Sequence, residues 1–365
     1  MGRRSNSIGV VLALGILSCL VRLEVAAAAV FQGLGDLPGG TVFSQAFAVS
    51  LDGSAVVGHS NSRSGNEAFR WTRAGGMAAL GSLPGGSFFS QAFAVSNHGN
   101  AIAGRAISGR GDEAFRWTAD AGMAGLGHLP GGLFSSEARG ISETGAVVVG
   151  ASYTTGGIQA FRWTGAGGMV SLGNLAGRPG FESRAYGVSA DGSIVVGYSH
   201  SPTGQQPFRW SASTGMAGLG NLGGTTQFGR ALGVSADGTV VVGQSASDKG
   251  LEAFRWTTTT GMVGLGDLAG GAFDSQAFAA SSDGSVVVGR GTTDLGPEAF
   301  LWTAADGLRN LKEVLVSRYG LQLSGWTLQQ ATGVSADGLT IVGFGLNPQG
   351  AMEAWIADLR GVPRP

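Results

Sequence analysis

Hydrophobic and polar positions along the chain follow a pattern that repeats with a fixed step. The triplet Phe-Arg-Trp returns every 46 or 47 residues, and a second phrase of the form Val-Ser-x-Asp-Gly keeps the same step. Complete and degraded copies of the two phrases together define seven units, which indicates a repeat protein. The triplets begin at Phe69, Phe115, Phe161, Phe208, Phe254 and, in the variant form Phe-Leu-Trp, at Phe300.

Each unit is predicted to form four short strands, because apolar and polar residues alternate in short runs separated by Gly-rich turns. In the triplet, the two aromatic residues fall on one face of a strand and the arginine falls on the other. The Asp-Gly pair that follows the first strand in most units predicts a type I′ hairpin turn, with positive φ at both central residues. In the second unit the predicted strands are Gln91–Ser96, Asn100–Gly104, Glu113–Thr118 and Met123–Leu129.

The two ends of the repeat region are out of phase with the units. The chain opens with an isolated fourth strand, Phe31–Leu37, and the seventh unit stops after its third strand, Met352–Leu359. Pairing these segments closes a ring and removes an exposed sheet edge, whereas a linear β-solenoid gains nothing from the offset and needs capping repeats. Four strands in about 40–45 residues also match a propeller blade. We therefore predict an all-β fold, a seven-bladed β-propeller over residues 30–360 that is closed by pairing the N-terminal strand with the C-terminal blade.

This arrangement carries expectations about packing. The first strand of each unit has small residues such as Ala46 and Ala48, which suits a crowded position beside the ring axis, where bulky side chains would collide. The aromatic residue that opens each triplet, with Trp355 in the seventh unit, is expected to fill the space between blades. The triplet arginines are expected to bond carboxylates or carbonyls between blades. Helical spacing of apolar residues in an insertion at 311–329 predicts a short helix near Lys312–Arg318.

Residues 1–29 have the pattern of a signal peptide. A pair of arginines precedes an apolar run, Ile8–Val21, and small residues at Ala26–Ala29 offer a cleavage site. The run is too short for a comfortable membrane span, so the mature protein is expected to be secreted and to have no membrane span. Cys19 is the only cysteine, so the mature protein has no disulfide, and the bulky Leu17 disfavours lipidation of Cys19.

Charge and composition exclude several functional classes. The chain has 23 Lys and Arg against 24 Asp and Glu, a net charge of −1, so no basic surface that could follow nucleic-acid phosphates is expected. The four histidines fall at different positions of the repeat, and no metal-ligand spacing is present. Turn geometry accounts for the recurring aspartates. The sequence therefore predicts no metal, no cofactor and no nucleic-acid partner.

One polar column is the candidate binding site. The residue that begins the first strand of each unit is polar, so in a ring these side chains would form a collar near one mouth of the channel. The preceding loops carry phenylalanines, and aromatic rings beside polar groups suit a sugar or peptide ligand. Loop packing with a Glu137–Arg184 ion pair between blades is the alternative interpretation. The predicted collar residues are Gln45, Gln91, Glu137, Arg184, Arg230, Gln276 and Gln330.

The repeat phrases resemble those of the HAF family of bacterial extracellular repeat proteins. The matching phrases include Glu-Ala-Phe-Arg-Trp and Gly-Met-x-x-Leu-Gly-x-Leu, and Ser324–Trp355 is similar to the closing unit of that family. The resemblance covers nearly all of the chain after the signal pattern and implies an extracellular location, but no particular activity. Many such proteins continue into a PEP-CTERM sorting segment. Here the tail at 361–365 has Arg364 in place of the acidic residue, which favours free release over membrane-bound sorting.

Together these observations predict a secreted, monomeric β-propeller without catalytic function that binds an extracellular glycan or a surface protein. An extracellular enzyme that acts on polysaccharide at the channel mouth is one alternative. Such an enzyme needs convergent carboxylates or a histidine-based set, and the collar supplies a single carboxylate, Glu137. A purely structural matrix protein is a third alternative.

Overall fold

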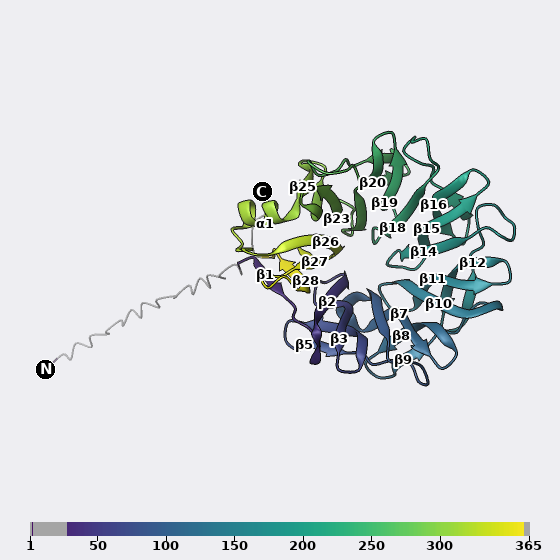
Figure 1. Ribbon diagram of the computed structural model, residues 1–365, viewed down its shortest axis with the longest axis horizontal. Coiled ribbons are helices and arrows are strands. Elements are labelled where there is room, and N and C mark those ends of the chain that lie inside the picture. Colours follow the sequence, from purple (N-terminus) through teal and green to yellow (C-terminus); the bar gives the residue numbers. More distant parts are fainter. Residues whose placement is uncertain (1, 3–27, 361–365) are drawn as a thin grey trace.

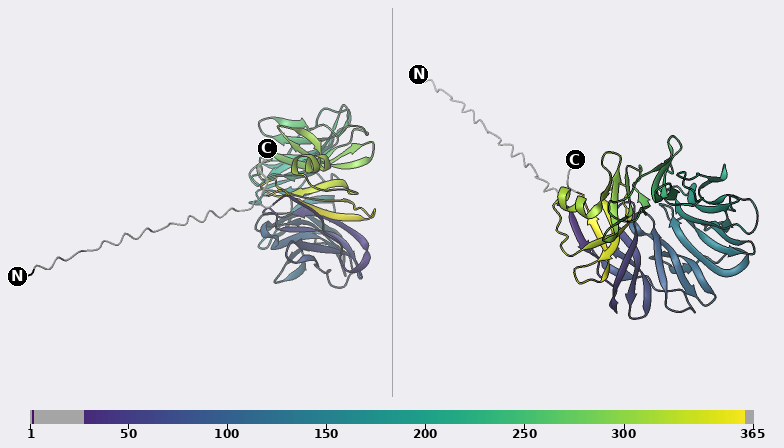
Figure 2. Two further views of the ribbon diagram at one scale, coloured as in Figure 1. Left: turned by 90° about the vertical axis from the view of Figure 1, so that its left-hand side faces the viewer. Right: turned by 45° about the horizontal axis from the view of Figure 1, so that its top comes forward.

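The computed structural model describes residue 2 and residues 28–360, which form seven four-stranded antiparallel sheets. The sheets stand as blades around a central channel, which makes the fold a seven-bladed β-propeller (Figure 1). Seen from the side, the ring is a thick disc (Figure 2). Nearly all of the predicted signal peptide, with Cys19, and the tail at 361–365 lie outside the described residues. Within the described part, no helix is both long and apolar enough to cross a membrane.

In six blades the strands run outward from the channel in chain order, and in the remaining blade the N-terminal strand is outermost. The innermost strands are β2 (Gly39–Val49), β6 (Ser90–Val95), β10 (Gly131–Ile141), β14 (Ser183–Val188), β18 (Gly229–Val234), β22 (Gln276–Ala280) and β26 (Thr327–Val334). The second strands are β3 (Ala55–Ser62), β7 (Ala101–Ser108), β11 (Val147–Thr154), β15 (Ile194–Ser201), β19 (Val240–Ser247), β23 (Val286–Thr293) and β27 (Thr340–Leu346). The third strands are β4 (Gly65–Thr72), β8 (Gly111–Thr118), β12 (Gly157–Thr164), β16 (Gly204–Ser211), β20 (Gly250–Thr257), β24 (Gly296–Thr303) and β28 (Met352–Asp358). The outermost strands are β5 (Gly76–Ala79), β9 (Gly122–Gly125), β13 (Gly168–Ser171), β17 (Gly215–Gly218), β21 (Gly261–Gly264), β25 (Gly307–Asn310) and β1 (Val30–Gly33).

We number the blades 1 to 7 by their innermost strands, so blade 7 consists of β26, β27, β28 and the N-terminal strand β1. In this blade β1 pairs antiparallel with β28, with Gly33 opposite Trp355 and Val30 opposite Asp358. The N–H of Leu34 extends the pairing to the carbonyl of Ala354 at 2.8 Å. Figure 1 shows the first strand, in purple, beside the last strands, in yellow. The predicted ring closure is therefore confirmed.

Aromatic side chains from the third strands fill the space between blades, as predicted. All seven are fully buried, and burying each one is worth roughly 1.5–3 kcal/mol. The blades therefore cohere through these contacts as well as through the strand ladders. The seven residues are Phe69, Phe115, Phe161, Phe208, Phe254, Phe300 and Trp355.

A buried serine near the start of most innermost strands bridges two blades. Ser90 of blade 2 accepts a hydrogen bond from the N–H of Ala68 on blade 1 (2.9 Å) and donates one to the carbonyl of Gly81 (2.6 Å). The serine thus satisfies two backbone groups where the outermost strand has ended. The same bridge is made by Ser44, Ser136, Ser183 and Ser275.

The boundary between blades 4 and 5 lacks this serine for a physical reason. Pro207 occupies the position of Ala68 and has no N–H to donate, and Gly229 occupies the position of the serine. A Cβ added at Gly229 would lie 2.7 Å from Cδ of Pro207. Each of the two departures from the repeat therefore fits the other.

The triplet arginines bond backbone carbonyls of the next blade, one of the two partners expected for them. Nε of Arg116, for example, donates to the carbonyl of Gly145 in the first turn of blade 3, at 2.8 Å. Blade 6 has Leu301 in place of the arginine. Near Leu301, α1 (Leu311–Tyr319) from the insertion packs against β24 and buries Leu311 and Leu315.

In six blades the turn after the innermost strand differs from the predicted type I′ geometry, because only its glycine has positive φ, so that prediction is wrong there. In blade 2 both His98 and Gly99 have positive φ. In blade 1 the N–H of Gly53 bonds the carbonyl of Ser50 (2.8 Å), and Gly53, unlike Asp52, has positive φ. The hydroxyl of Ser50 donates to Asp52 (2.6 Å) and accepts the N–H of Ala55 (3.0 Å). These side-chain bonds stabilise a longer turn in which the aspartate acts as an acceptor at ordinary φ.

Candidate ligand-binding channel mouth

Each innermost strand directs the side chain at its centre into the channel. This residue lies between the two small positions of the strand, because successive side chains on a strand alternate between its faces. In blade order the channel residues are Phe47, Phe93, Arg139, Tyr186, Leu232, Phe278 and Thr332.

The expectation that bulky side chains are excluded beside the axis is wrong for this column. The crowded position is the neighbouring small residue, which faces the next innermost strand. A Cβ added at Gly233 would lie 2.6 Å from the carbonyl oxygen of Phe278, and one added at Gly333 would lie 3.1 Å from the backbone nitrogen of Val49. Small residues are therefore needed between blades, while the channel has room for rings.

A cavity of about 420 Å³ occupies the channel and is lined by all of this column. It lies within the range of roughly 300–1,000 Å³ that is typical of small-ligand sites. Phe344 on β27 adds a further ring, opposite Gln330 in the strand ladder. Three predicted collar residues complete the lining, and they are Arg230, Gln276 and Gln330.

The cavity has an aromatic side and a polar side. On the aromatic side, the ring centroid of Phe47 lies 5.3 Å from that of Phe93 and 6.4 Å from that of Phe344. On the polar side, the guanidinium of Arg139 stacks over the ring of Phe93, 4.0 Å from its centroid, and Tyr186 follows on the next blade. A ligand in this cavity would meet flat apolar surfaces and hydrogen-bonding groups together.

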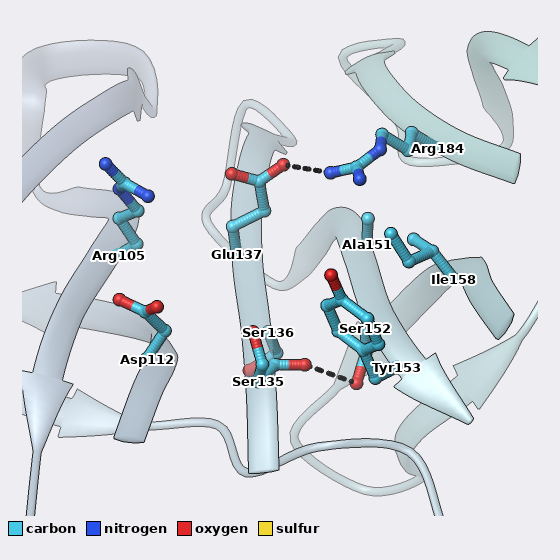
Figure 3. Close-up of a pocket in the computed structure, with 10 residues that line it drawn as sticks. All are labelled: Arg105, Asp112, Ser135, Ser136, Glu137, Ala151, Ser152, Tyr153, Ile158 and Arg184. Carbon is cyan, nitrogen blue, oxygen red and sulfur yellow. Dashed lines mark hydrogen bonds and ion pairs between the residues drawn. The ribbon is translucent and has the colours of Figure 1, made fainter. Parts of the chain in front are cut away.

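Two other collar residues, Glu137 and Arg184, line a second, smaller cavity of about 200 Å³. Figure 3 shows Glu137 pointing toward Arg184, with Arg105 on the opposite side. The carboxylate of Glu137 bonds Nη1 of Arg184 (3.1 Å) and Nη2 of Arg139 (2.9 Å). The ion pair between blades that the alternative interpretation requires is therefore present.

These arginines control the ionisation of Glu137. Burial raises the pKa of Glu137, but the charge and hydrogen bond of Arg139, followed by the charges of Arg184 and Arg105, lower it further, so the net pKa lies below the ordinary value. Glu137 is therefore an ionised partner for guanidinium groups rather than a proton donor.

The last two collar residues, Gln45 and Gln91, do not line either cavity. Gln45 is half-buried and lies opposite His59 in the pairing of β2 with β3. Gln91 accepts a hydrogen bond from Nε of Arg105 at 3.1 Å. The seven predicted residues thus occupy equivalent positions around the ring, but the structure brings three of them to one cavity and two to another.

Arg230 differs from the other collar arginine in its partners. Nη2 of Arg230 donates to the amide oxygen of Gln244 (3.0 Å). With the amide of Gln276 turned so that its oxygen faces Arg230, that oxygen lies 2.9 Å from Nη2. Within residues 28–360, no carboxylate lies at ion-pair distance from Arg230. Its charge therefore contacts neutral groups only.

His59 is the histidine nearest to the aromatic side of the cavity. Its ring lies 5.5 Å from Phe43 and 5.1 Å from Phe47, centroid to centroid. Burial, with a smaller contribution from the charge of Arg105, lowers the pKa of His59 to about 4. His59 is therefore neutral at ordinary pH. Among the described residues no group of three or more His, Cys, Asp or Glu side chains is placed to hold a metal ion.

The phenylalanines of the loops before the innermost strands carry basic side chains on their faces. The guanidinium of Arg110 lies 4.2 Å from the ring centroid of Phe134, and that of Arg178 lies 4.9 Å from Phe181. Such contacts contribute about 0.5–1 kcal/mol at exposed sites. Most of these rings are therefore engaged in loop packing, although Phe88 is 40% exposed. The rings of the channel column are the ones that converge on one cavity.

The channel column is not among the residues predicted from the sequence, although its signal is visible there. Every innermost strand has one variable residue between two small ones, as in Ala46-Phe47-Ala48. The repeat keeps the small residues and changes the residue between them. This pattern indicates that the blades share their packing but present different side chains to the channel.

No protein-family model matches the chain, and no match is found among curated proteins. Solved structures share the fold. The oligogalacturonate lyase from Vibrio parahaemolyticus is 10% identical over 91% of this chain and 97% of its own, with a TM-score of 0.56. A prolyl endopeptidase structure is 11% identical over 84% of this chain and 49% of its own, with a TM-score of 0.55.

TolB from Acinetobacter baumannii is 12% identical over 72% of this chain, with a TM-score of 0.47. The present chain spans 65% of that protein and 49% of the prolyl endopeptidase. At these identities the likeness to the lyase and the peptidase shows a β-propeller fold and nothing about activity.

Proposed function

We propose that the protein is a secreted, non-enzymatic β-propeller that binds an extracellular glycan or protein ligand at its channel mouth. The observation that carries the proposal is the cavity of about 420 Å³ in which aromatic, amide and guanidinium side chains converge from all seven blades. A structural ring could fill its axis with any apolar residues. The mixed lining instead suits a ligand with both flat apolar faces and hydrogen-bonding groups.

Secretion is supported by the signal-peptide pattern of residues 1–29 and by the resemblance of the repeat phrases to the extracellular HAF family. The mature protein would then act as a monomer outside the cell. The two cavities and the collar all belong to a single chain, so the proposed site needs no second copy.

The geometry gives less support to a polysaccharide-acting enzyme. Hydrolysis or elimination needs a group that gives or takes a proton near the bound sugar. The carboxylate of the collar, Glu137, is engaged by Arg139 and Arg184, which hold its pKa below the ordinary value. A carboxylate in this state is a poor general acid, so the arrangement favours binding.

A glycan array and a pull-down from the native extracellular fraction test the proposal. The double variant Arg230→Ala/Gln330→Ala removes two polar groups of the cavity and is expected to lose binding by about tenfold or more. The matched control is Gln45→Ala, because Gln45 belongs to the collar but does not line the cavity. We expect Gln45→Ala to bind as the unmodified protein does.

Two outcomes would contradict the proposal. If the unmodified protein retained neither a glycan nor a protein, a structural matrix role would be favoured. If the double variant bound as tightly as the control variant, the ligand would lie elsewhere on the ring. Thermal unfolding of each variant establishes that the fold is retained.

A further inference from the structure

The channel cavity contains positive charge without negative charge. Among its lining residues the charged side chains are Arg139 and Arg230, and neither Asp nor Glu contributes to the lining. The two arginines come from blades 3 and 5, on either side of Tyr186 of blade 4. An anionic group held here would gain charge-assisted hydrogen bonds from planar guanidinium groups.

The two arginines are in different electrostatic states. Arg139 is neutralised in part, because Nη2 bonds the carboxylate of Glu137 at 2.9 Å. Arg230 contacts the amide groups of Gln244 and Gln276, which are both buried. Amide oxygens orient the guanidinium without cancelling its charge, so Arg230 is the stronger attractor for an anion.

The uncharged residues that line the cavity indicate what the rest of the ligand would be. The rings of Phe47 and Phe278 offer flat surfaces for the C–H faces of a sugar. Gln330 and Thr332 offer donors and acceptors to sugar hydroxyl groups. A hydroxyl-rich ring that also carries a carboxylate satisfies all three kinds of group.

We infer that the channel mouth binds an acidic saccharide, one whose sugar units carry carboxylates, with a carboxylate held by Arg230. The inference rests on the proposed function and adds the charge of the ligand to it. A carboxylate is also found in acidic peptides, but these lack the hydroxyl-rich rings that the amide and aromatic groups would contact.

The test uses isothermal titration of the full chain with a galacturonate trimer and with its fully methyl-esterified form. The two probes share their rings and differ in charge. The unmodified protein should bind the acid at least tenfold more tightly than the ester, and added salt should weaken binding of the acid only. Arg230→Gln should lose about 10- to 100-fold in affinity for the acid, and the loss for the ester should be at least tenfold smaller.

Arg178→Gln is the matched control, because it removes an arginine that stacks on Phe181 and does not line the channel cavity. Arg230→Lys keeps the charge without the planar fork, so it should lose less affinity than Arg230→Gln. Thermal unfolding verifies that each variant is folded.

Equal affinity for acid and ester would overturn the inference and leave the proposed binding function intact. Tighter binding of a glutamate-rich peptide than of the trimer would also overturn it, and would identify a protein ligand. If Arg178→Gln and Arg230→Gln lost equal affinity for the acid, the effect would come from overall surface charge, and the inference would also be overturned. If no glycan or peptide bound in a way that depends on Arg230 or Gln330, the proposed function itself would fail.

Discussion

Blade 2 and blade 7 have the same architecture but different chain connectivity. In blade 2 a short turn links β8 to β9, whereas in blade 7 the corresponding strands, β28 and β1, come from opposite ends of the described chain. The contacts nevertheless match. The N–H of Leu126 bonds the carbonyl of Ala114 at 2.8 Å, and the N–H of Leu34 bonds that of Ala354 at 2.8 Å.

The side-chain contacts of the two blades also correspond. Glu113 accepts the N–H of Gly127 at 3.0 Å in blade 2, and Glu353 accepts the N–H of Gly35 at 2.9 Å in blade 7. What differs lies at the end of the third strand. Asp358 of blade 7 bonds Arg73 and Arg360 where blade 2 has its turn. The comparison teaches that ring closure uses the contacts of an ordinary blade, and that the ion pairs of Asp358 join blade 7 to Arg73 of blade 1 instead of joining β28 to β1.

The largest expected effect concerns the residue that fills the blade boundary. Trp355→Ala should lower the free energy of unfolding by about 3–5 kcal/mol, and Phe115→Ala in blade 2 by a similar amount, because both side chains are fully buried. Chemical denaturation measures both. Hydrogen exchange should separate them, since in blade 7 β1 has no covalent turn to hold it and its amides should lose protection first.

Trp355→Phe is the control for this prediction. It installs the residue that the other six blades use and removes an indole N–H that has no partner among the described residues. The cost should therefore be well below that of the alanine variant. A loss as large as that of Trp355→Ala would mean that closure depends on the indole ring rather than on burial.

The bridging serines should give the next largest effect. Ser44→Ala and Ser136→Ala each leave a buried N–H unpaired, at a cost of about 1–3 kcal/mol. Thermal denaturation compares them. The double variant Ala114→Pro/Ser136→Gly copies the boundary between blades 4 and 5 and should cost less than the sum of its single variants. Additive costs would show that Pro207 and Gly229 do not compensate for one another.

A smaller effect is expected at the triplet arginines. Arg116→Gln removes the hydrogen bond to the carbonyl of Gly145 and should cost about 1 kcal/mol. Arg63, which is exposed in the turn between β3 and β4, serves as the control, and Arg63→Gln should change stability by less than about 0.5 kcal/mol. Equal effects in urea denaturation would argue that the arginine column does not join the blades.

The smallest effect is the pH dependence of the ion pairs at the end of blade 7. Burial raises the pKa of Asp358, but hydrogen bonds from Arg360 and the charges of Arg360 and Arg73 lower it further, below the ordinary value of 3.8. The stabilisation is therefore present above about pH 4 and is lost as the pH falls through the folded-state pKa. The side chains of both arginines are about half exposed, at 52% and 42%, so the contribution should stay below about 1 kcal/mol.

Asp358→Asn tests this point through unfolding measured across pH. The gap in stability between the unmodified protein and the variant should be widest at neutral pH and should close under acid conditions. A gap that persisted unchanged below pH 3 would show that Asp358 acts through hydrogen bonds alone.

Most of the fold could be predicted from the sequence because the same pattern of four short strands occurs seven times. The phase of the ends, with Phe31 at one end and Trp355 at the other, is enough to predict closure, since a single partner can complete each open sheet. The turn geometry was predicted wrongly because Asp-Gly is ambiguous by itself. The hydroxyl of Ser50, two residues before Asp52, bonds the aspartate and stabilises the longer turn. This contact is visible in the folded structure but not in the order of the residues.

The candidate site was less predictable because equivalent positions in a ring need not share a cavity. Gln45 and Arg230 occupy the same step of the repeat, yet Arg230 lines the channel cavity and Gln45 does not. The channel residue Phe47 was overlooked because crowding was assigned to the wrong face of the innermost strand. Strand alternation sends Ala46 and Ala48 toward neighbouring blades and leaves Phe47 free to face the axis.

The place of β1 in the last blade has a consequence for biosynthesis. The strand that begins the ordered ring is synthesised first, and its partner β28 is synthesised last, so the circle cannot form until the ribosome has translated every blade. A product that stops short of Met352 leaves both halves of the join open to proteolysis. Only a chain that carries all seven repeats can therefore close the ring and protect the join from proteases.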